Sequence, residues 1–147
     1  MKSGFTLLEL IVTVALIMAV AGTVMTGKHY NDERILRNAV LVLHADIQYA
    51  QRKAVTEGRR TGIQFDAENN RYHVMTNEPE FQIFRTVMFS GGVELLSSTH
   101  ERERITYLPR GTGNPGTLML RNGQFTQRIT TTFSGGQVII HELVDGG

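Results

Sequence analysis

Cysteine and tryptophan are absent from this chain of 147 residues, and only three residues are proline. Without cysteine, the chain has no disulfide framework, no thiol nucleophile and no cysteine-ligated zinc site. Fifteen basic residues against 14 acidic ones give a formal net charge of +1, so bulk charge gives no reason to expect a nucleic-acid-binding protein. With 41% hydrophobic residues, the composition is that of one folded domain rather than of a low-complexity or disordered chain.

Long hydrophobic runs are also missing, except near the N-terminus. The segment 10–25 carries no charge, and the wider segment 5–27 contains one charged residue, Glu9. A helix of about 20 apolar residues is long enough to cross a membrane. The sequence therefore predicts either a single membrane-spanning helix at 5–27 or an export signal that is removed. Because Lys2 precedes the run, we expect the N-terminus in the cytoplasm and the rest of the chain outside it.

A conventional secretory signal is one interpretation of this segment. Ala19, Val20 and Ala21, directly before Gly22, form a small-residue cleavage site of the kind that signal peptidase uses. Glu9 argues against it, because a carboxylate within an apolar segment costs about 2.5 to 3.5 kcal/mol unless it finds a partner. The simplest explanation of Glu9 is a position near the membrane interface, but acids inside membrane segments are by default candidates for function.

Six consecutive residues lead into the apolar run: Gly4, Phe5, Thr6, Leu7, Leu8 and Glu9. This motif resembles the class III signal of type IV pilins and type II secretion pseudopilins. The resemblance implies that a prepilin peptidase removes the leader 1–4 by cleaving between Gly4 and Phe5, that the new amine of Phe5 is methylated, and that the apolar segment is retained. It also implies a role in assembly for Glu9, whose carboxylate would pair with the terminal amine of a neighbouring subunit.

Beyond the apolar run, hydrophobic residues recur at spacings of three and four, which predicts an amphipathic helix over 28–58. They are Ile35, Leu36, Ala39, Val40, Leu43, Ile47, Ala50, Ala54 and Val55. Gly58 is the predicted stop signal, which places the end of the helix near Glu57. The remainder, 59–147, reads mostly as strands, with a hairpin turn at Asn122-Gly123. We expect an α+β fold in which a long N-terminal helix, a transmembrane half followed by an amphipathic half, packs on a mainly antiparallel β-sheet.

The predicted strands cover 61–65, 71–75, 82–89, 93–96, 104–108, 117–120, 124–133 and 137–141. The stretch 97–104 is predicted as a charged loop that contributes nothing to the core. From Ile105 onward, several short motifs follow one another: 105–111, 116–120, Asn122-Gly123, Arg128-Ile129 and 134–138. Their pattern resembles the C-terminal domain of the minor pilin group that comprises GspH of type II secretion and FimT and FimU of type IV pili.

This resemblance implies a minor pseudopilin or minor pilin, a structural subunit at or near the tip of a type II secretion pseudopilus or a type IV pilus, which supports assembly and protein secretion. The implied partners are other pilins or pseudopilins in a hetero-oligomeric filament, the prepilin peptidase, the inner-membrane assembly platform and membrane lipid. The implied location is the inner membrane, with one span and a periplasmic or extracytoplasmic domain.

Motifs for enzyme chemistry fail in their context. The segment 111–116 satisfies the GxGxxG pattern of dinucleotide-binding proteins, but Pro115 leads into a predicted strand, whereas the fingerprint requires a helix. The five histidines have no metal-ligand spacing, and none lies in a recognised nucleophile arrangement. Proximity of His44 and Asp46 to a strand histidine is left open. We expect no catalytic residues, no metal, no cofactor and no enzymatic activity.

An alternative function is that of a pilus-tip DNA-binding subunit for DNA uptake, as in some FimT-like pilins. Arg59 and Arg60 would be its contacts, at the predicted helix end. Acids interleave with the arginines, among them Glu57, Glu101 and Glu103, and phosphate binding depends on an uncompensated basic patch. We therefore do not expect DNA as a partner.

Overall fold

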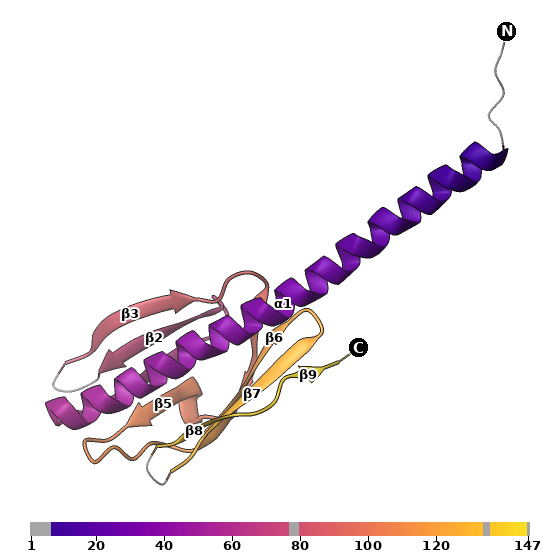
Figure 1. Ribbon diagram of the computed structural model, residues 1–147. Coiled ribbons are helices and arrows are strands. Elements are labelled where there is room, and N and C mark those ends of the chain that lie inside the picture. Colours follow the sequence, from indigo (N-terminus) through magenta and orange to yellow (C-terminus); the bar gives the residue numbers. More distant parts are fainter. Residues whose placement is uncertain (1–6, 77–79, 134–135, 147) are drawn as a thin grey trace. The chain divides into compact units, whose positions relative to one another are not determined.

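The computed structural model describes residues 7–76, 80–133 and 136–146, without the side chains of 22–29 (Figure 1). Its contacts divide the chain into two compact units, Met1–Asn31 and Asp32–Gly147. Helix α1 (Leu7–Glu57) supplies residues to both units. The first unit consists, in its described part, of the N-terminal portion of this helix, and the second unit contains the rest of α1 and all strands.

The end of α1 confirms the prediction from the sequence. The helix stops at Glu57, and Gly58 follows with a φ of +64°. A residue just after a helix often takes this left-handed conformation, which glycine adopts without the steric cost that a side chain brings. The position of Gly58 therefore explains why the chain turns here from helix to strand.

The strands form two antiparallel sheets, where the sequence had led us to expect one. The first has the order β3-β2-β1-β5 and the second has the order β4-β6-β7-β8, with β9 also paired to β7. The strands of the first sheet are β1 (Thr61–Asp66), β2 (Arg71–Thr76), β3 (Gln82–Met88) and β5 (Arg104–Tyr107). Those of the second are β4 (Val93–Ser98), β6 (Gly116–Asn122), β7 (Phe125–Thr131), β8 (Val138–Ile140) and β9 (Val144–Asp145). A short 3₁₀ turn, η1 (Glu101–Glu103), joins β4 to β5.

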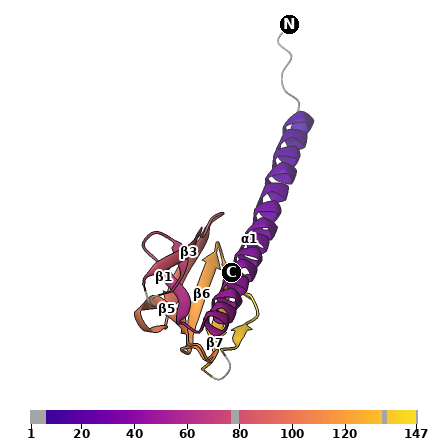
Figure 2. The same ribbon diagram turned by 90° about the vertical axis from the view of Figure 1, so that its left-hand side faces the viewer.

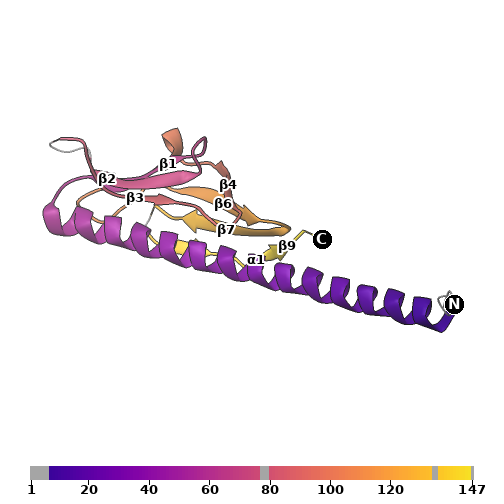
Figure 3. The same ribbon diagram turned by 90° about the horizontal axis from the view of Figure 1, so that it is seen from above.

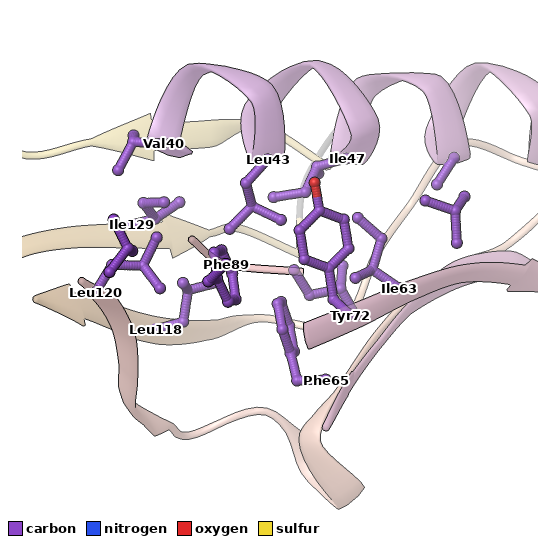
Figure 4. Close-up of a cluster of buried hydrophobic side chains, with 14 of the residues drawn as sticks. Val40, Leu43, Ile47, Ile63, Phe65, Tyr72, Phe89, Leu118, Leu120 and Ile129 are labelled. Carbon is purple, nitrogen blue, oxygen red and sulfur yellow. The ribbon is translucent and has the colours of Figure 1, made fainter. Parts of the chain in front are cut away.

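The core of the second unit lies between α1 and both sheets. Within this unit, α1 runs along one side of the strands (Figures 2 and 3). Figure 4 shows Val40, Leu43 and Ile47 of α1 directed toward side chains of both sheets. The fully buried helical side chains are Leu36, Val40, Leu43, Ile47, Ala50 and Ala54, as the apolar spacing predicts. Of the other predicted positions, Ile35 and Ala39 are partly buried and pack against the core, whereas Val55, about 100° around the helix from Ala54, is exposed.

The prediction for 97–104 was wrong. Its first two residues, Ser97 and Ser98, belong to β4, and His100 is buried, with its ring centroid 6.5 Å from that of Phe65. Burial of this polar ring is possible because both of its nitrogens have partners. Nε2 lies 2.8 Å from Thr131 Oγ1, and Nδ1 lies 3.1 Å from Ser98 Oγ.

Candidate assembly site

The predicted cleavage site, Gly4 and Phe5, lies outside the described residues. Glu9 lies in the first turn of α1 and is exposed. Its backbone carbonyl accepts a hydrogen bond of 2.8 Å from Thr13 Oγ1, which also donates to the Leu10 carbonyl at 2.9 Å. The threonine hydroxyl thus bonds back to the helix that carries it. Glu9 therefore lies within a regular turn of the helix.

The N-terminal part of α1 has a surface made almost entirely of exposed apolar side chains. Every side chain over 7–21 is exposed, and apart from Glu9 and Thr13 they are apolar. Among the residues that the structure describes, no helix combines the length and the apolar character that crossing a membrane requires. Exposed apolar patches of this kind mark surfaces that bind another protein or a membrane.

The two arginines proposed as DNA contacts differ in their surroundings. Arg59 Nε donates to Glu57 Oε2 at 2.6 Å, and Lys53 forms an ion pair with the same carboxylate. These two hydrogen bonds, that of Lys53 first, hold the pKa of Glu57 below its usual range. Arg60 instead lines a cavity on the first sheet together with Arg102 and Arg104. Arg59 therefore shares the single carboxylate of Glu57 with Lys53.

The GxGxxG segment is a loop between strands, as expected. It contains an isolated bridge between Tyr107 and Gly113, and β6 begins at Gly116 without an intervening helix. No helix N-terminus is available here to face a pyrophosphate.

Within the part of the chain that the structure describes, His44 and Asp46 do not form a cluster with a histidine of the strands. His44 contacts Gln48 at 3.1 Å, whereas Asp46 is buried and accepts hydrogen bonds from Tyr72 and Arg85. Within the described ranges, no group of three or more potential metal ligands occurs. The possibility left open by the sequence, a cluster of His44 and Asp46 with a strand histidine, is not realised.

Two polar groups of the folded core were missed by the analysis of the sequence. The first is the carboxylate of Asp46 with its two donors. A polar residue beside Leu43 and Ile47, on an otherwise apolar helical stripe, was the available signal. The second is His100, where burial lowers the pKa to about 4, so that the ring is neutral at physiological pH. Both groups have hydrogen-bond partners within the folded core.

The comparisons with known proteins fit this geometry. Residues 39–135 match the family described as Type II transport protein GspH. The chain belongs to the GspH family. The matched region starts in α1 at Ala39 and continues beyond β7, so it covers the first sheet and most of the second, but not β8, β9 or Glu9. A search of the curated proteins finds no significant match.

Solved structures with the GspH fold are similar to this chain. The minor pseudopilin EpsH from the type 2 secretion system of Vibrio cholerae is 13% identical, with a TM-score of 0.60 over 72% of this chain and 95% of EpsH. The type IV minor pilin FimU of Pseudomonas aeruginosa is 17% identical, with a TM-score of 0.61 over 77% of this chain and 92% of FimU. At these identities the likeness establishes the fold: a long N-terminal helix on antiparallel sheets, as predicted.

Proposed function

We propose that this GspH-family chain is a minor pseudopilin or minor pilin. It acts as a structural, non-enzymatic subunit at or near the tip of a type II secretion pseudopilus or a type IV pilus, and it supports filament assembly and protein secretion. The observation that carries the proposal is the GspH match over 39–135, in a fold whose helix continues into an exposed apolar segment.

The N-terminal segment supplies the assembly function in this proposal. A prepilin peptidase removes 1–4, and Phe5 becomes the methylated N-terminus. The segment 5–27 then anchors the chain in the inner membrane before assembly and packs against other pilins in the filament. Support comes from the Gly4–Glu9 motif and from the exposed apolar side chains over 7–21, which need lipid or other helices to cover them.

Glu9 has a specific part in this assembly. Its carboxylate neutralises the amine of Phe5 on a neighbouring subunit, since either charge alone is costly in an apolar environment. The remaining partners are the assembly platform in the inner membrane and the other subunits of the filament. The domain after the span lies on the periplasmic or extracytoplasmic side.

Intact-mass measurement on chain extracted from membranes tests the proposal. The expected product starts at Phe5, carries one methyl group and keeps the apolar segment. The matched control is the same chain expressed without the prepilin peptidase, which should retain 1–4. A mature terminus at Gly22 would establish ordinary signal-peptidase cleavage and contradict the proposal.

A further inference from the structure

The first sheet has an outer face that points away from its core. Ile63 and Phe65 of β1 are buried in the core, so the alternating residues Gly62 and Gln64 belong to the opposite face. Gln64 is directly opposite Arg104 of β5 in the register, which places both side chains on this outer face.

A basic cavity of about 280 Å³ lies on this face. Three arginines line it, Arg60, Arg102 and Arg104. The rest of the lining is Thr61, Gly62, Met75 and Thr106. No carboxylate lines the cavity among the described residues, and neither Arg102 nor Arg104 forms an ion pair within them. Two guanidinium groups are thus close together without an acid to compensate them.

The side chain of Gln64 holds these two arginines in place. Gln64 Nε2 donates to the carbonyl oxygen of Arg102 at 3.0 Å, and Gln64 Oε1 accepts a hydrogen bond from Arg104 Nε at 2.7 Å. Arg102 and the next residue, Glu103, have φ values of +55° and +53°, a costly conformation for residues with side chains. The hydrogen bonds of Gln64 help to hold this turn, which leaves the outer nitrogens of both guanidinium groups to contact a ligand.

Gly62 contributes to the lining of the cavity without a side chain. A Cβ at Gly62 would lie 2.0 Å from the carbonyl oxygen of Ile105, so no other residue fits at position 62 without a shift of the strand. Because position 62 carries no side chain, the space between the arginines stays open.

Gln64 lines a second cavity, which is acidic. Its lining includes Asp66, Glu68, Glu103 and His73, and its volume is about 430 Å³. Asp66 is held by Arg71 at 2.8 Å, but Glu68 and Glu103 form no ion pair within the described part of the chain. The face therefore places uncompensated positive charge beside uncompensated negative charge.

This charge pattern selects between kinds of partner. A nucleic-acid backbone laid across the face would bring its phosphates against Glu68 and Glu103, which repel them. A protein surface can place one carboxylate in the basic cavity and keep its other acids away from the acidic one. Guanidinium groups bind carboxylates through paired hydrogen bonds, which gives such a contact orientation as well as attraction.

We propose that Arg102 and Arg104, assisted by Arg60, bind a carboxylate on an acidic segment of a protein partner. The inference rests on the proposed function, because it assigns to another subunit of the filament the partner that supplies this carboxylate. The contact is separate from the one made by Glu9, since the two sites lie in different units of the chain.

Fluorescence anisotropy on the full chain in detergent micelles tests the inference. The probe is a short labelled peptide with adjacent glutamates, and the control probe carries glutamines in their place. Replacement of both arginines, Arg102→Ala with Arg104→Ala, should weaken binding of the glutamate peptide roughly tenfold, because each exposed ion pair contributes up to about 1 kcal/mol. Added salt should weaken binding in the same direction.

Two further variants make the result specific. Arg128→Ala removes the same charge from an exposed position on β7 in the other sheet and should leave binding unchanged. Arg102→Ala alone removes a guanidinium group that makes no hydrogen bond within the described residues, so its loss of binding should come without a change in thermal unfolding.

Several results would overturn the inference. They are absence of binding by the unaltered chain, an equal loss in Arg128→Ala, tighter and arginine-dependent binding of a DNA duplex, and self-association of the chain that the double variant abolishes. Peptide binding does not depend on filament assembly, so the two proposals can fail separately. If the chain crosslinks to pilins but does not bind the peptide, only this inference is contradicted. If the chain binds the peptide but has its terminus at Gly22, only the proposed function is contradicted.

Discussion

The hydroxyl of Tyr72 donates a hydrogen bond to Oδ2 of Asp46 at 2.7 Å. The other carboxylate oxygen, Oδ1, accepts a hydrogen bond from Arg85 Nη1 at 2.9 Å. One buried carboxylate of α1 is therefore tied to both β2 and β3. Burial, followed by the hydrogen bond to Asp46, raises the pKa of Tyr72, so its phenol remains a donor at any physiological pH.

Replacement of the tyrosine, Tyr72→Phe, should destabilise the second unit. It keeps the ring in the core but leaves Oδ2 of Asp46 buried without its donor, a defect that costs about 1 to 3 kcal/mol. Chemical denaturation followed by circular dichroism measures the change in free energy of unfolding. The matched control is Tyr49→Phe on an exposed part of α1, which should change it by less than about 0.5 kcal/mol.

Arg85 shares the same carboxylate, so its substitution should not be additive with that of Tyr72. A double-mutant cycle of Tyr72→Phe and Arg85→Ala should give a coupling energy of about 0.5 kcal/mol or more. A coupling energy near zero would mean that the two donors act on Asp46 independently. Because the Arg85 side chain is half exposed, we expect its single substitution to cost less than that of Tyr72.

Two leucines of α1 provide a direct test of how the helix packs. Leu43 is fully buried in the core between α1 and the sheets, whereas Leu41, two positions earlier, is 59% exposed. Leu43→Ala should cost about 2 to 5 kcal/mol, from lost apolar burial and the cavity that remains. Leu41→Ala should be nearly neutral. Equal destabilisation by both substitutions, measured by thermal unfolding, would contradict the orientation of the helix.

The features predicted correctly depend on local sequence. The end of α1 at Glu57 follows from Gly58, and the buried stripe follows from the spacing of Leu36, Val40 and Leu43. The error at His100 has a non-local cause, because its partner Thr131 lies 31 positions along the chain. The charged residues of 97–104 predict a loop. The burial of His100 within this segment depends on tertiary contacts, which the local sequence does not indicate.

The two candidate sites also differ in whether their signal is local in the sequence. Glu9 is a candidate from the sequence alone, because its signal is a contiguous motif in front of an apolar run. The basic cavity was not predicted from the sequence, because it depends on the strand pairing that aligns Gln64 with Arg104 and on a left-handed turn at Arg102. The division of the strands into two sheets was missed for the same reason, since pairing partners are not encoded in local periodicity.

His100 should make stability depend on pH in the acidic range. Burial lowers its pKa in the folded chain to about 4, while in the unfolded chain the value returns to about 6.5. Between these two values the unfolded state binds more protons than the folded state, so stability falls as the pH falls. From pH 7 to pH 5 this one group should remove about 2 kcal/mol of the free energy of unfolding.

Denaturant titrations at several pH values measure this effect. The variant His100→Gln lacks the titrating ring and should lose less stability on acidification, although it starts from a lower value because the ring contact with Phe65 is gone. The matched control is His44→Gln, which removes a ring from a partly buried position of α1 outside the apolar core and should keep the pH dependence of the unaltered chain. An unchanged slope in His100→Gln would assign the acid sensitivity to another group.

Glu9 should matter for assembly and not for insertion, processing or folding. If its carboxylate neutralises the Phe5 amine of a neighbouring subunit, Glu9→Ala leaves that amine buried and unpaired, a defect that costs about 3 to 5 kcal/mol. Crosslinking to partner pilins should therefore fail. Membrane insertion should proceed, because removal of the charge makes the segment more apolar.

Two comparisons separate the charge of Glu9 from its size and from acidity elsewhere on α1. Glu9→Gln keeps the shape of the side chain without its charge and should fail in crosslinking as Glu9→Ala does. Glu33→Gln removes a partly buried acid that pairs with Arg37 on the same helix and should assemble normally. Leader cleavage, followed by mass, should be complete in all three variants. Since Glu9 lies in the unit that contains no strands, the thermal unfolding of the second unit should also be unchanged. Normal crosslinking of Glu9→Gln would mean that the carboxylate is tolerated near the interface without a partner amine, and the proposed charge pairing between subunits would then be wrong.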